Sequence, residues 1–320
     1  MFFYFVEEID MNRKKILGIL FFSILLLPAF SETLNILSFN ILGAKYNHTK
    51  ENPVWMSNLA EIIKNNKADI VLLQEVPQIY SEEIEHNSFA DELINLLGED
   101  WGYRSSASYS NCSYNLNNAI LYRYRSVLIL REIDNSSYDF KYKNVQMVEF
   151  TLRNNYDKRF YVVNLHLPFD RAKISSPTNE MKMKMESIKN LILIYDRRFP
   201  AVFGGDFNMS RREIIRETQF SNSVKYTIDG NSSIYNDEQG LLTTISTKKT
   251  QGIQLSSGYD HFIVNNRFTI KKEMRRCFSE LQSNNRNCSF ITVGSRIYNN
   301  SESYKEYVSD HIPIIISLEF

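Results

Sequence analysis

The sequence predicts a single α/β domain, and three observations lead to that prediction. Apolar runs of strand length alternate with segments of helical periodicity from Leu34 to Phe320. The chain has 320 residues, of which 43% are hydrophobic, so it is long enough to bury one large core. The sequence contains no internal repeat, no low-complexity tract and no Pro/Gly linker that would divide this region.

The charges balance, because 37 basic side chains face 37 acidic ones and the formal net charge is zero. The chain therefore has no global field that would attract a polyanion. Contact with a nucleic acid would have to come from local basic patches instead.

The N-terminal segment has the organisation of a secretory signal peptide. A basic stretch, Met11–Lys15, precedes an apolar run, Ile16–Leu27, and small residues precede a cleavage point after Ser31. The run is too short for a membrane-spanning helix, although a membrane anchor is the alternative reading. We expect residues 1–31 to be a signal peptide whose true start is Met11. The mature domain, residues 32–320, would then be secreted or periplasmic.

The first part of the mature chain alternates strand and helix. Leu34–Asn40 alternates apolar and polar residues and predicts a strand that ends on Asn40. A Pro at the first helical position follows Asn52 and predicts a helix over Val54–Lys67. The continuous apolar run Ala68–Leu73 predicts a central strand that ends on Gln74-Glu75. A second helix is expected over Phe89–Leu97.

The remaining elements follow the same logic of apolar runs between polar breaks. The expected strands are Asn118–Arg123, Ser126–Arg131, Val145–Leu152, Phe160–Leu167, Ala201–Phe203, Gly258–Val264 and Ile312–Phe320. A helix is expected over Glu180–Tyr195. The stretch Asn265–Tyr307 is rich in Asn, Ser and charge, so we expect a long surface excursion there.

The stretch AVFGGDFN, residues 201–208, is the most informative part of the chain. An apolar strand runs into two glycines, and Asp206 and Asn208 follow two residues apart, so they share one face in extended geometry. A carboxylate beside an amide suits a hard cation and a phosphoryl oxygen. Taken alone, such a pair is more often explained by turn chemistry.

Other strands of the chain end in similar polar residues. The residues at strand ends are Asn40, Glu75, His166, Asp206, Asn208, Asp260, Asp310 and His311. Buried carboxylates are costly unless they are paired or bind a metal. We therefore expect these side chains to form a common site.

The motifs that carry these residues resemble a known family. SFNI, LLQEV, NLHLP, GGDFN, YDHFIV and SDHIPI resemble, in this order, the motif set of the endonuclease/exonuclease/phosphatase superfamily, nearest to its deoxyribonuclease I-like branch. The resemblance covers Leu34 to Phe320. It implies a four-layer α/β/β/α sandwich, in which two mixed β-sheets pack face to face with helices on the outside.

The resemblance also implies a divalent-metal site. Glu75 would ligate the ion, with Asp310 in the same region. Asn40 would belong to the metal site and would position Glu75 or the substrate phosphate. The expected ion is Mg²⁺ or Mn²⁺, with Ca²⁺ as an alternative. Cys/His zinc spacings are absent from the sequence.

The same resemblance implies roles in hydrolysis of a P–O bond by water, without a covalent intermediate. Asp206 would orient the attacking water, and Asn208 would hold a phosphate oxygen. His311 would be oriented by Asp260, and His166 would stand across the phosphate, so the two histidines provide a general base and a proton donor. Separately, Arg123 matches an arginine of the family that contacts phosphate.

Several features depart from the branch pattern. The Arg that follows the metal-binding Glu in that branch is missing from Gln74–Gln78, and Tyr103–Tyr109 offers no acid to pair with His166. His261 directly follows Asp260, so on a strand it points to the other face, and we expect it to be structural or on the surface. Cys277 and Cys288 are spaced so that they could close a loop, which would leave Cys112 free.

These features predict an exported, metal-dependent nuclease that acts on DNA rather than RNA. The alternative is a sphingomyelinase or another phospholipid or inositol-phosphate hydrolase on the same scaffold. The polar character of Lys271–Tyr307 argues against membrane insertion. A third hypothesis is a binding module with an inactive centre. The sequence indicates no obligate protein partner. The base-excision repair branch typically lacks the histidine that stands at His166.

Overall fold

The computed structural model of the chain describes sixteen segments. They are residues 33–42, 53–77, 88–106, 116–133, 145–167, 200–218, 226–229, 243–244, 253–255, 257–265, 267–277, 287–288, 291–293, 296–298, 304–305 and 308–320. Thr33–Phe320 forms one compact unit. The predicted signal peptide, the predicted helix Glu180–Tyr195 and Cys112 lie outside the described residues.

The first of two six-stranded sheets has the strand order β12-β16-β1-β2-β4-β3. Its strands are β1 (Thr33–Asn40), β2 (Ile70–Pro77), β3 (Trp101–Ser105), β4 (Leu116–Arg123), β12 (Thr269–Arg276) and β16 (Ile314–Glu319). β1 runs parallel to β2 and antiparallel to β16, so the sheet is mixed. The continuous apolar run of β2 fits its position inside the sheet, where both faces of a strand are covered.

The second sheet has the strand order β5-β6-β7-β8-β11-β9. Its strands are β5 (Val127–Glu132), β6 (Val145–Leu152), β7 (Asn155–His166), β8 (Ala201–Asp206), β9 (Tyr226–Ile228) and β11 (Asp260–Asn265). β7 and β8 are parallel, and their register places His166 beside Asp206. β11 runs antiparallel to β8, and its first residue, Asp260, pairs with Asp206.

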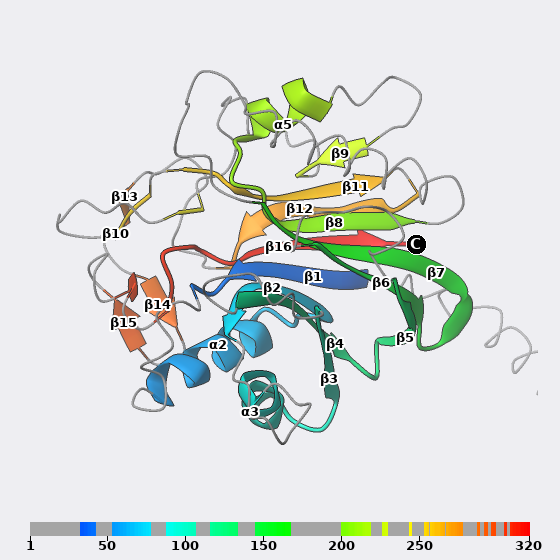
Figure 1. Ribbon diagram of the computed structural model, residues 1–320, viewed down its shortest axis with the longest axis horizontal. Coiled ribbons are helices and arrows are strands. Elements are labelled where there is room, and N and C mark those ends of the chain that lie inside the picture. The colour runs from blue at the N-terminus through cyan, green and yellow to red at the C-terminus, as the bar shows by residue number, and fades with distance from the viewer. Residues whose placement is uncertain are drawn as a thin grey trace, which may run out of the picture. The chain divides into compact units, whose positions relative to one another are not determined.

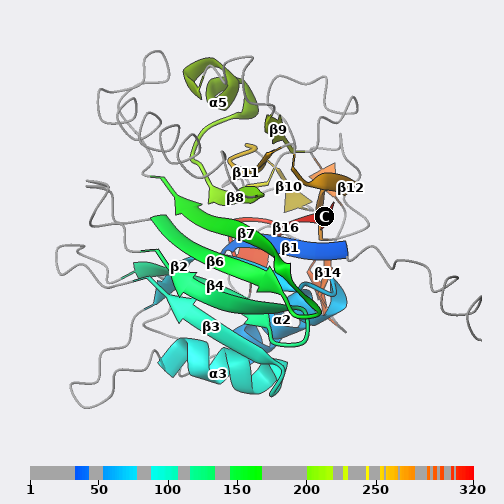
Figure 2. The same cartoon turned by 90° about the vertical axis from the view of Figure 1, so that its right-hand side faces the viewer.

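The two sheets pack face to face with helices on their outer faces (Figure 1). An apolar cluster that includes Leu72, Ile120, Phe150 and Phe262 fills the space between the sheets. Helices α2 (Pro53–Asn65) and α3 (Ser88–Leu97) pack on the outer face of the first sheet. Helix α5 (Arg211–Thr218) packs on the outer face of the second sheet through Ile214. Figure 2 shows α3 and α5 on opposite sides of the two sheets, which confirms the predicted α/β/β/α sandwich.

The segment Asn265–Tyr307 differs from the expected surface excursion. Within it, β12 pairs with β16 at the edge of the first sheet, and Tyr304 is fully buried. The sequence TIKKEMRR of β12 hides the strand, because an edge strand exposes many of its side chains and here they are charged. Two small two-stranded sheets also involve this segment. β13 (Asn287–Cys288) pairs with β10 (Ile253–Gln254), which precedes the segment, and β14 (Ile291–Val293) pairs with β15 (Arg296–Tyr298).

The possible disulfide bond between Cys277 and Cys288 is absent. Cys277 is a free thiol packed against the outer core of the first sheet, so the bridge to Cys288 is not formed. Burial raises the pKa of the Cys277 thiol, which makes it a poor nucleophile.

Among the described residues, no helix combines the length and the apolar character that crossing a membrane would need.

The second glycine of GGDFN is required by the pairing of β7 with β8. Gly205 has a φ of 149°, a conformation that side chains disfavour, and a Cβ at this position would overlap the carbonyl oxygen of Leu165. Leu165 is its register partner on β7. The pairing that brings His166 beside Asp206 therefore depends on a residue without a side chain.

We expect Gly205→Ala to lower the free energy of unfolding by at least about 3 kcal/mol, because it combines backbone strain with overlap in a core ladder. The matched control is Gly98→Ala, which shares a positive φ of 108° but meets nothing within 4 Å, and should lose only about 1–2 kcal/mol. Urea denaturation of both variants measures the difference. Equal losses would show that strain alone explains the requirement for glycine.

Candidate active site

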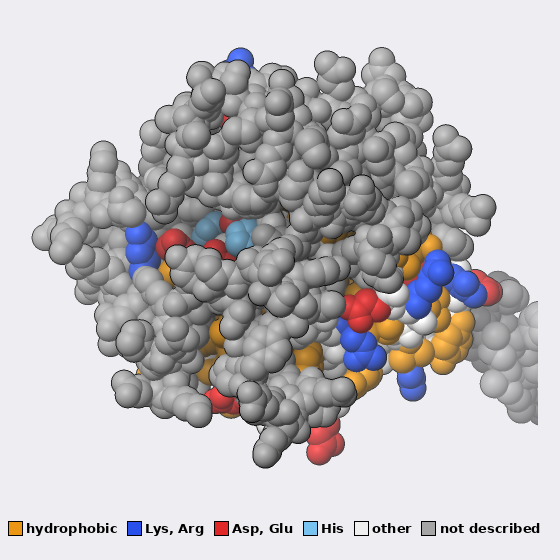
Figure 3. Space-filling view, in the orientation of Figure 1, with side chains coloured by type: hydrophobic (Ala, Val, Ile, Leu, Met, Phe, Trp, Pro, Cys, Tyr) orange, Lys and Arg blue, Asp and Glu red, His pale blue; other side chains and the backbone are white. Residues whose placement is uncertain are grey.

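The polar ends of strands from both sheets meet at one rim of the sandwich. Asn40 ends β1 beside Gln74 of β2, and His166 ends β7 beside Asp206 of β8. Because each of these pairs is parallel, their carboxyl ends lie at the same edge of their sheets. The segment before β16 adds Asp310 and His311. Figure 3 shows histidine and acidic side chains together in a hollow of one face.

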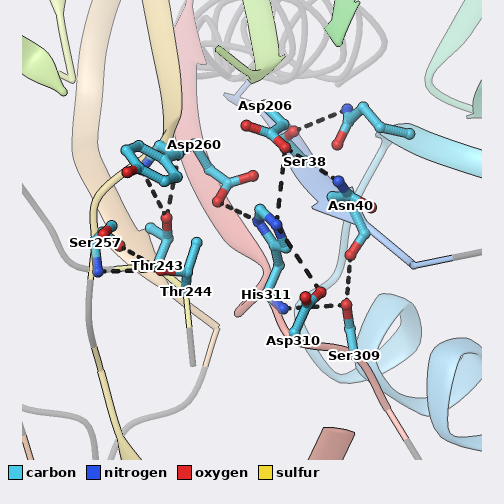
Figure 4. Close-up of polar contacts among 12 residues, drawn as sticks. Ser38, Asn40, Asp206, Thr243, Thr244, Ser257, Asp260, Ser309, Asp310 and His311 are labelled. Atoms are coloured by element: carbon cyan, nitrogen blue, oxygen red, sulfur yellow. Dashed lines mark hydrogen bonds and ion pairs between the residues drawn. The ribbon is translucent and has the colours of Figure 1, made fainter. Parts of the chain in front are cut away.

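His311 forms the strongest ion pair of the site. Its Nδ1 lies 2.8 Å from Oδ2 of Asp260, and both side chains are almost fully buried. Burial by itself lowers the pKa of His311, but the carboxylates of Asp260 and Asp206 outweigh it and raise the pKa to about 10. The ring is therefore an imidazolium at neutral pH. Its Nε2 faces Oδ2 of Asp206 at 3.7 Å (Figure 4).

Short hydrogen bonds from neighbouring segments fix the His311–Asp260 pair. The backbone N–H of His311 donates to Oγ of Ser309, whose hydroxyl donates to the backbone oxygen of Asn40. The N–H of Asp260 donates to Oγ1 of Thr243, and the N–H of Ile312 donates to the Thr243 carbonyl. Ser309 and Thr243 thus position both partners. Thr243 was not identified from the sequence, because no motif includes it.

Asp206 stands at the centre of the amide contacts. Its Oδ2 accepts from Nδ2 of Asn40 at 3.1 Å, and its Oδ1 accepts from the backbone N–H of Asn208 at 2.8 Å. Burial raises the pKa of Asp206, and the nearby His311 charge opposes that shift. Asn208 has a φ of 49°, which Asn tolerates better than most residues, and its amide donates to the Leu167 carbonyl at 2.6 Å.

Glu75 reaches the rim from a bulge. The β2–β4 register shifts between Leu73 and Val76, and Glu75 has a φ of 56°. Such a conformation costs about 1–3 kcal/mol for a side-chain-bearing residue and clusters at functional sites. The Glu75 side chain is half-buried, with Oε1 at 3.9 Å from Nε2 of His166. The same Nε2 lies 3.8 Å from Oδ2 of Asp206, so His166 faces two carboxylates.

Asn40 presents its amide nitrogen to two carboxylates of the site. Its Nδ2 donates to Oε1 of Glu75 at 3.3 Å and to Oδ2 of Asp206 at 3.1 Å. Its Oδ1, the atom that would bind a cation, accepts the N–H of Leu42 at 3.0 Å. Asn40 therefore bridges two carboxylates as a donor, which agrees with the expectation that it positions Glu75.

The donor atoms at the rim fit a hard divalent cation. Oδ1 of Asp310 is buried without a hydrogen-bond partner and lies 4.0 Å from Nε2 of His311, and Glu75 adds a second carboxylate. Within the part of the chain that the structure describes, no three Asp, Glu, His or Cys side chains form a complete metal cage. One or two carboxylates, completed by water and substrate oxygens, are the arrangement that Mg²⁺ prefers in proteins.

Arg123 is far from this cluster, contrary to the prediction that it contacts phosphate. It ends β4 opposite Trp101, its N–H donates to the Asp69 carbonyl, and its Nε lies 3.6 Å from Oδ2 of Asp100. Asn117, six positions back along β4, is the residue that faces Val76 next to Glu75. Six strand residues correspond to about 20 Å. The motif match did not show that Arg123 lies at the end of β4 away from the site.

A polar bridge inside the sandwich is the main feature that sequence reasoning missed. Nε2 of Gln74 donates to Oδ1 of Asn164 at 2.8 Å and to Oγ of Ser38 at 3.2 Å. Nδ2 of Asn164 donates to the carbonyls of Leu73 and Ala119. Both amides are fully buried. The available signal was an amide inside each of two apolar strands, next to Glu75 and two residues before His166.

The comparison with protein families agrees with this geometry. The model of the Endonuclease/Exonuclease/phosphatase family matches residues 37–311. The chain belongs to this family. The family comprises phosphoester hydrolases, so the match places the chain among them, and no curated protein matches its sequence significantly.

Solved structures share the fold at low sequence identity. A family protein from Bacteroides thetaiotaomicron has a TM-score of 0.61 and 16% identity, with 90% of this chain and 95% of that chain covered. TDP2 of D. rerio, complexed with a single-strand DNA product, has a TM-score of 0.60 and 14% identity, with coverages of 90% and 100%. A mannosyl-6-phosphatase from B. thetaiotaomicron has a TM-score of 0.56 and 16% identity, with coverages of 90% and 100%.

We expect Asp260→Asn to lower the pKa of His311 from about 10 by about 1–3 pH units, because the substitution removes the carboxylate that favours the charged ring. NMR titration of the imidazole in metal-free buffer measures this change. The matched control is Asp100→Asn, which removes a carboxylate at the far end of β4 and should leave the titration of His311 unchanged. An unchanged His311 pKa in the Asp260 variant would refute the assigned pairing.

Proposed function

We propose that the protein is an exported, divalent-metal-dependent phosphodiesterase that cuts nucleic acid, with DNA preferred over RNA. The observation that carries the hydrolytic part is the approach of the His311 imidazolium to the buried Asp206 carboxylate, at 3.7 Å. The basic and apolar pattern of residues 11–31 supports export.

The site separates a proton acceptor from a proton donor. Asp206 is an acceptor for a water proton, and its burial, which raises its pKa, improves it in that role. His311, held as an imidazolium by Asp260, donates a hydrogen bond to a phosphoryl oxygen and stabilises its charge. His166, at the end of β7 in the second sheet, is the candidate donor to the leaving oxygen. The products of this step are a phosphate group bearing the water oxygen and a free hydroxyl.

Asn208 and Asn40 hold the acceptor in place. Asn208 donates through its backbone and its amide to Asp206, and Asn40 donates to the same carboxylate. Both are therefore positioning residues for Asp206. The role in phosphate binding that we predicted for Asn208 would use its amide, which already bonds the Leu167 carbonyl.

Glu75 and Asp310 are the residues that would hold Mg²⁺ or Mn²⁺, with Ca²⁺ as an alternative. Such an ion would supply positive charge to the phosphoryl oxygens as negative charge develops there. The partly exposed carboxylates and the unpartnered Oδ1 of Asp310 support this assignment.

Two observations bear on the choice of substrate. A protein of the same fold holds a single-strand DNA product, which supports nucleic acid. Another is a mannosyl-6-phosphatase, which supports a small phosphate ester as the second candidate. The arginines closest to the rim along the chain are Arg211 and Arg212, at the start of α5, three residues beyond Asn208. Arg125, by contrast, pairs with Asp100 at the far end of the first sheet.

We expect the full-length protein to cut plasmid DNA in Mg²⁺ and to stop cutting in EDTA. Asp206→Asn and His311→Gln should each lower the rate about 10²–10⁴-fold, because each removes a group that moves or holds a proton. The control is Lys271→Ala, which breaks an exposed ion pair with Glu319 at the opposite end of the first sheet and should leave the rate unchanged.

The same assay should include RNA, sphingomyelin vesicles, inositol phosphates and mannose 6-phosphate. Cleavage of one of these without cleavage of DNA would replace the nuclease proposal by the corresponding esterase. Activity toward none of them, or activity that survives both substitutions, would remove the proposed mechanism.

A further inference from the structure

His261 lies directly behind the site and takes no part in the chemistry described above. It follows Asp260 on β11, and its side chain points to the opposite face of the strand. The ring is fully buried, and so is Asp229, the residue after β9. The sequence suggested only a structural or surface histidine, yet this ring bonds three segments at once.

Both ring nitrogens of His261 face hydrogen-bond acceptors. Nε2 lies 3.0 Å from the carbonyl oxygen of Met209 and 3.0 Å from that of Gly258. Nδ1 lies 2.8 Å from Oδ2 of Asp229. A carbonyl oxygen only accepts, so Nε2 must carry a hydrogen, and a second hydrogen must lie between Nδ1 and the carboxyl group. The geometry therefore places two hydrogens on the pair, and the raised pKa of His261 places both on the ring, as an imidazolium beside a carboxylate.

Asp229 is fixed as firmly as the histidine. Its Oδ1 accepts the N–H of Phe262 at 2.9 Å, and its own N–H donates to the Phe262 carbonyl at 2.8 Å. Its φ of 58° is a conformation that the surrounding bonds must hold. Burial lowers the pKa of His261, but the charge of Asp229, its hydrogen bond and the charge of Asp260 together raise it. These contacts keep the ring protonated.

The two carbonyls that share Nε2 flank the catalytic carboxylates. Met209 follows Asn208 in the loop after β8, and Gly258 stands two residues before Asp260. A further hydrogen bond links the same two segments, because the N–H of Phe207 donates to the Tyr259 carbonyl. The Phe207 ring contacts the His261 ring edge to face. The loop that follows Asp206 and the segment that carries Asp260 are thus joined on the face of β11 opposite the Asp260 side chain.

We propose that the Asp229–His261 ion pair positions the catalytic groups. It connects the loop that follows Asp206 to strand β11, which begins at Asp260, and so sets the distance between Asp206 and His311. The inference rests on the proposed function for its effect on catalysis, but its geometry does not. A buried ion pair is stable only when both partners are present and fully bonded. Loss of the ring hydrogens leaves two buried carbonyls and one carboxylate oxygen, Oδ2 of Asp229, without this partner.

The first experiment examines the protonation of His261 by nitrogen NMR of the full-length protein. The five histidines are assigned with single His→Gln variants. We expect two ring N–H groups on His261 at a pH above the ordinary histidine pKa of about 6.5. A single N–H, or a titration near that ordinary value, would overturn the proposal.

The second experiment compares substitutions of the pair. His261→Phe keeps the ring volume but removes both donors, and it should lower kcat about 10–100-fold with little change in KM, because the catalytic groups shift without loss of substrate contacts. The double variant His261→Gln with Asp229→Asn restores a donor to the carbonyls and makes the pair neutral. It should recover kcat to within about fivefold of the wild-type value.

The matched control is Thr151→Val, which removes a buried hydrogen-bond donor at the far end of β6 in the same sheet. It should cost stability but leave kcat unchanged. A folded His261→Phe variant with wild-type kcat would overturn the proposal. If that variant does not fold, a folded double variant with kcat reduced as strongly as expected for the single one would overturn it equally.

A readout independent of turnover separates this proposal from the proposed function. The Nδ1–H signal of His311 reports on its bond to Asp260. It should shift in His261→Phe, return toward its wild-type position in the double variant, and stay unchanged in Thr151→Val. If the wild-type protein hydrolyses no phosphoester, the proposed function fails while this signal still decides the positioning role. An unshifted His311 signal in a folded His261→Phe variant would overturn that role. If that variant does not fold, a folded double variant whose His311 signal is displaced from the wild-type position would overturn it equally.

Discussion

The hydrogen bond between Gln74 and Asn164 joins the two sheets beside the apolar cluster that lies between them, and the geometry of the rim depends on it. Each amide lies close in sequence to a site residue, Glu75 in one sheet and His166 in the other. Sliding one sheet against the other would leave several buried amide groups unpaired, at about 1–3 kcal/mol each. One atom, Oε1 of Gln74, stays unpaired even in the observed register. The bridge therefore selects one alignment of the sheets among those that apolar packing alone allows.

The site contains the sequence Asp-His twice, and in neither case do the neighbours pair with each other at short range. His311 pairs with Asp260, and His261 pairs with Asp229. In a strand, adjacent side chains point to opposite faces, so His261 on β11 finds its carboxylate on another segment. Asp260 and His261 consequently serve two different ion pairs, one on the substrate face and one behind it. This arrangement joins the catalytic pair to its supporting pair through a single peptide unit.

The sequence was sufficient for elements whose apolar runs are continuous and for the order of the site motifs. Val145–Leu152 matches β6 residue for residue, and the sandwich layers agree with the resemblance. β12 was missed because its pattern of charged residues carries little hydrophobic signal at the sheet edge. Arg123 was misplaced because a motif match does not say which end of a strand lies at the site. Periodicity cannot reveal contacts between segments far apart in the chain. Two features depend on such contacts: the amide atom that Asn40 presents to the carboxylates, and the pairing of His261 with Asp229.

The residues of the rim are drawn from almost the whole length of the domain, from Asn40 to His311. Contacts of such large sequence separation form late and slowly, since long loops must close before the contacts stabilise them. No fragment that lacks either end can assemble the acceptor, the donor and their supports together. Recovery of turnover after dilution from denaturant should therefore lag behind recovery of strand structure, and it would time the last step of folding.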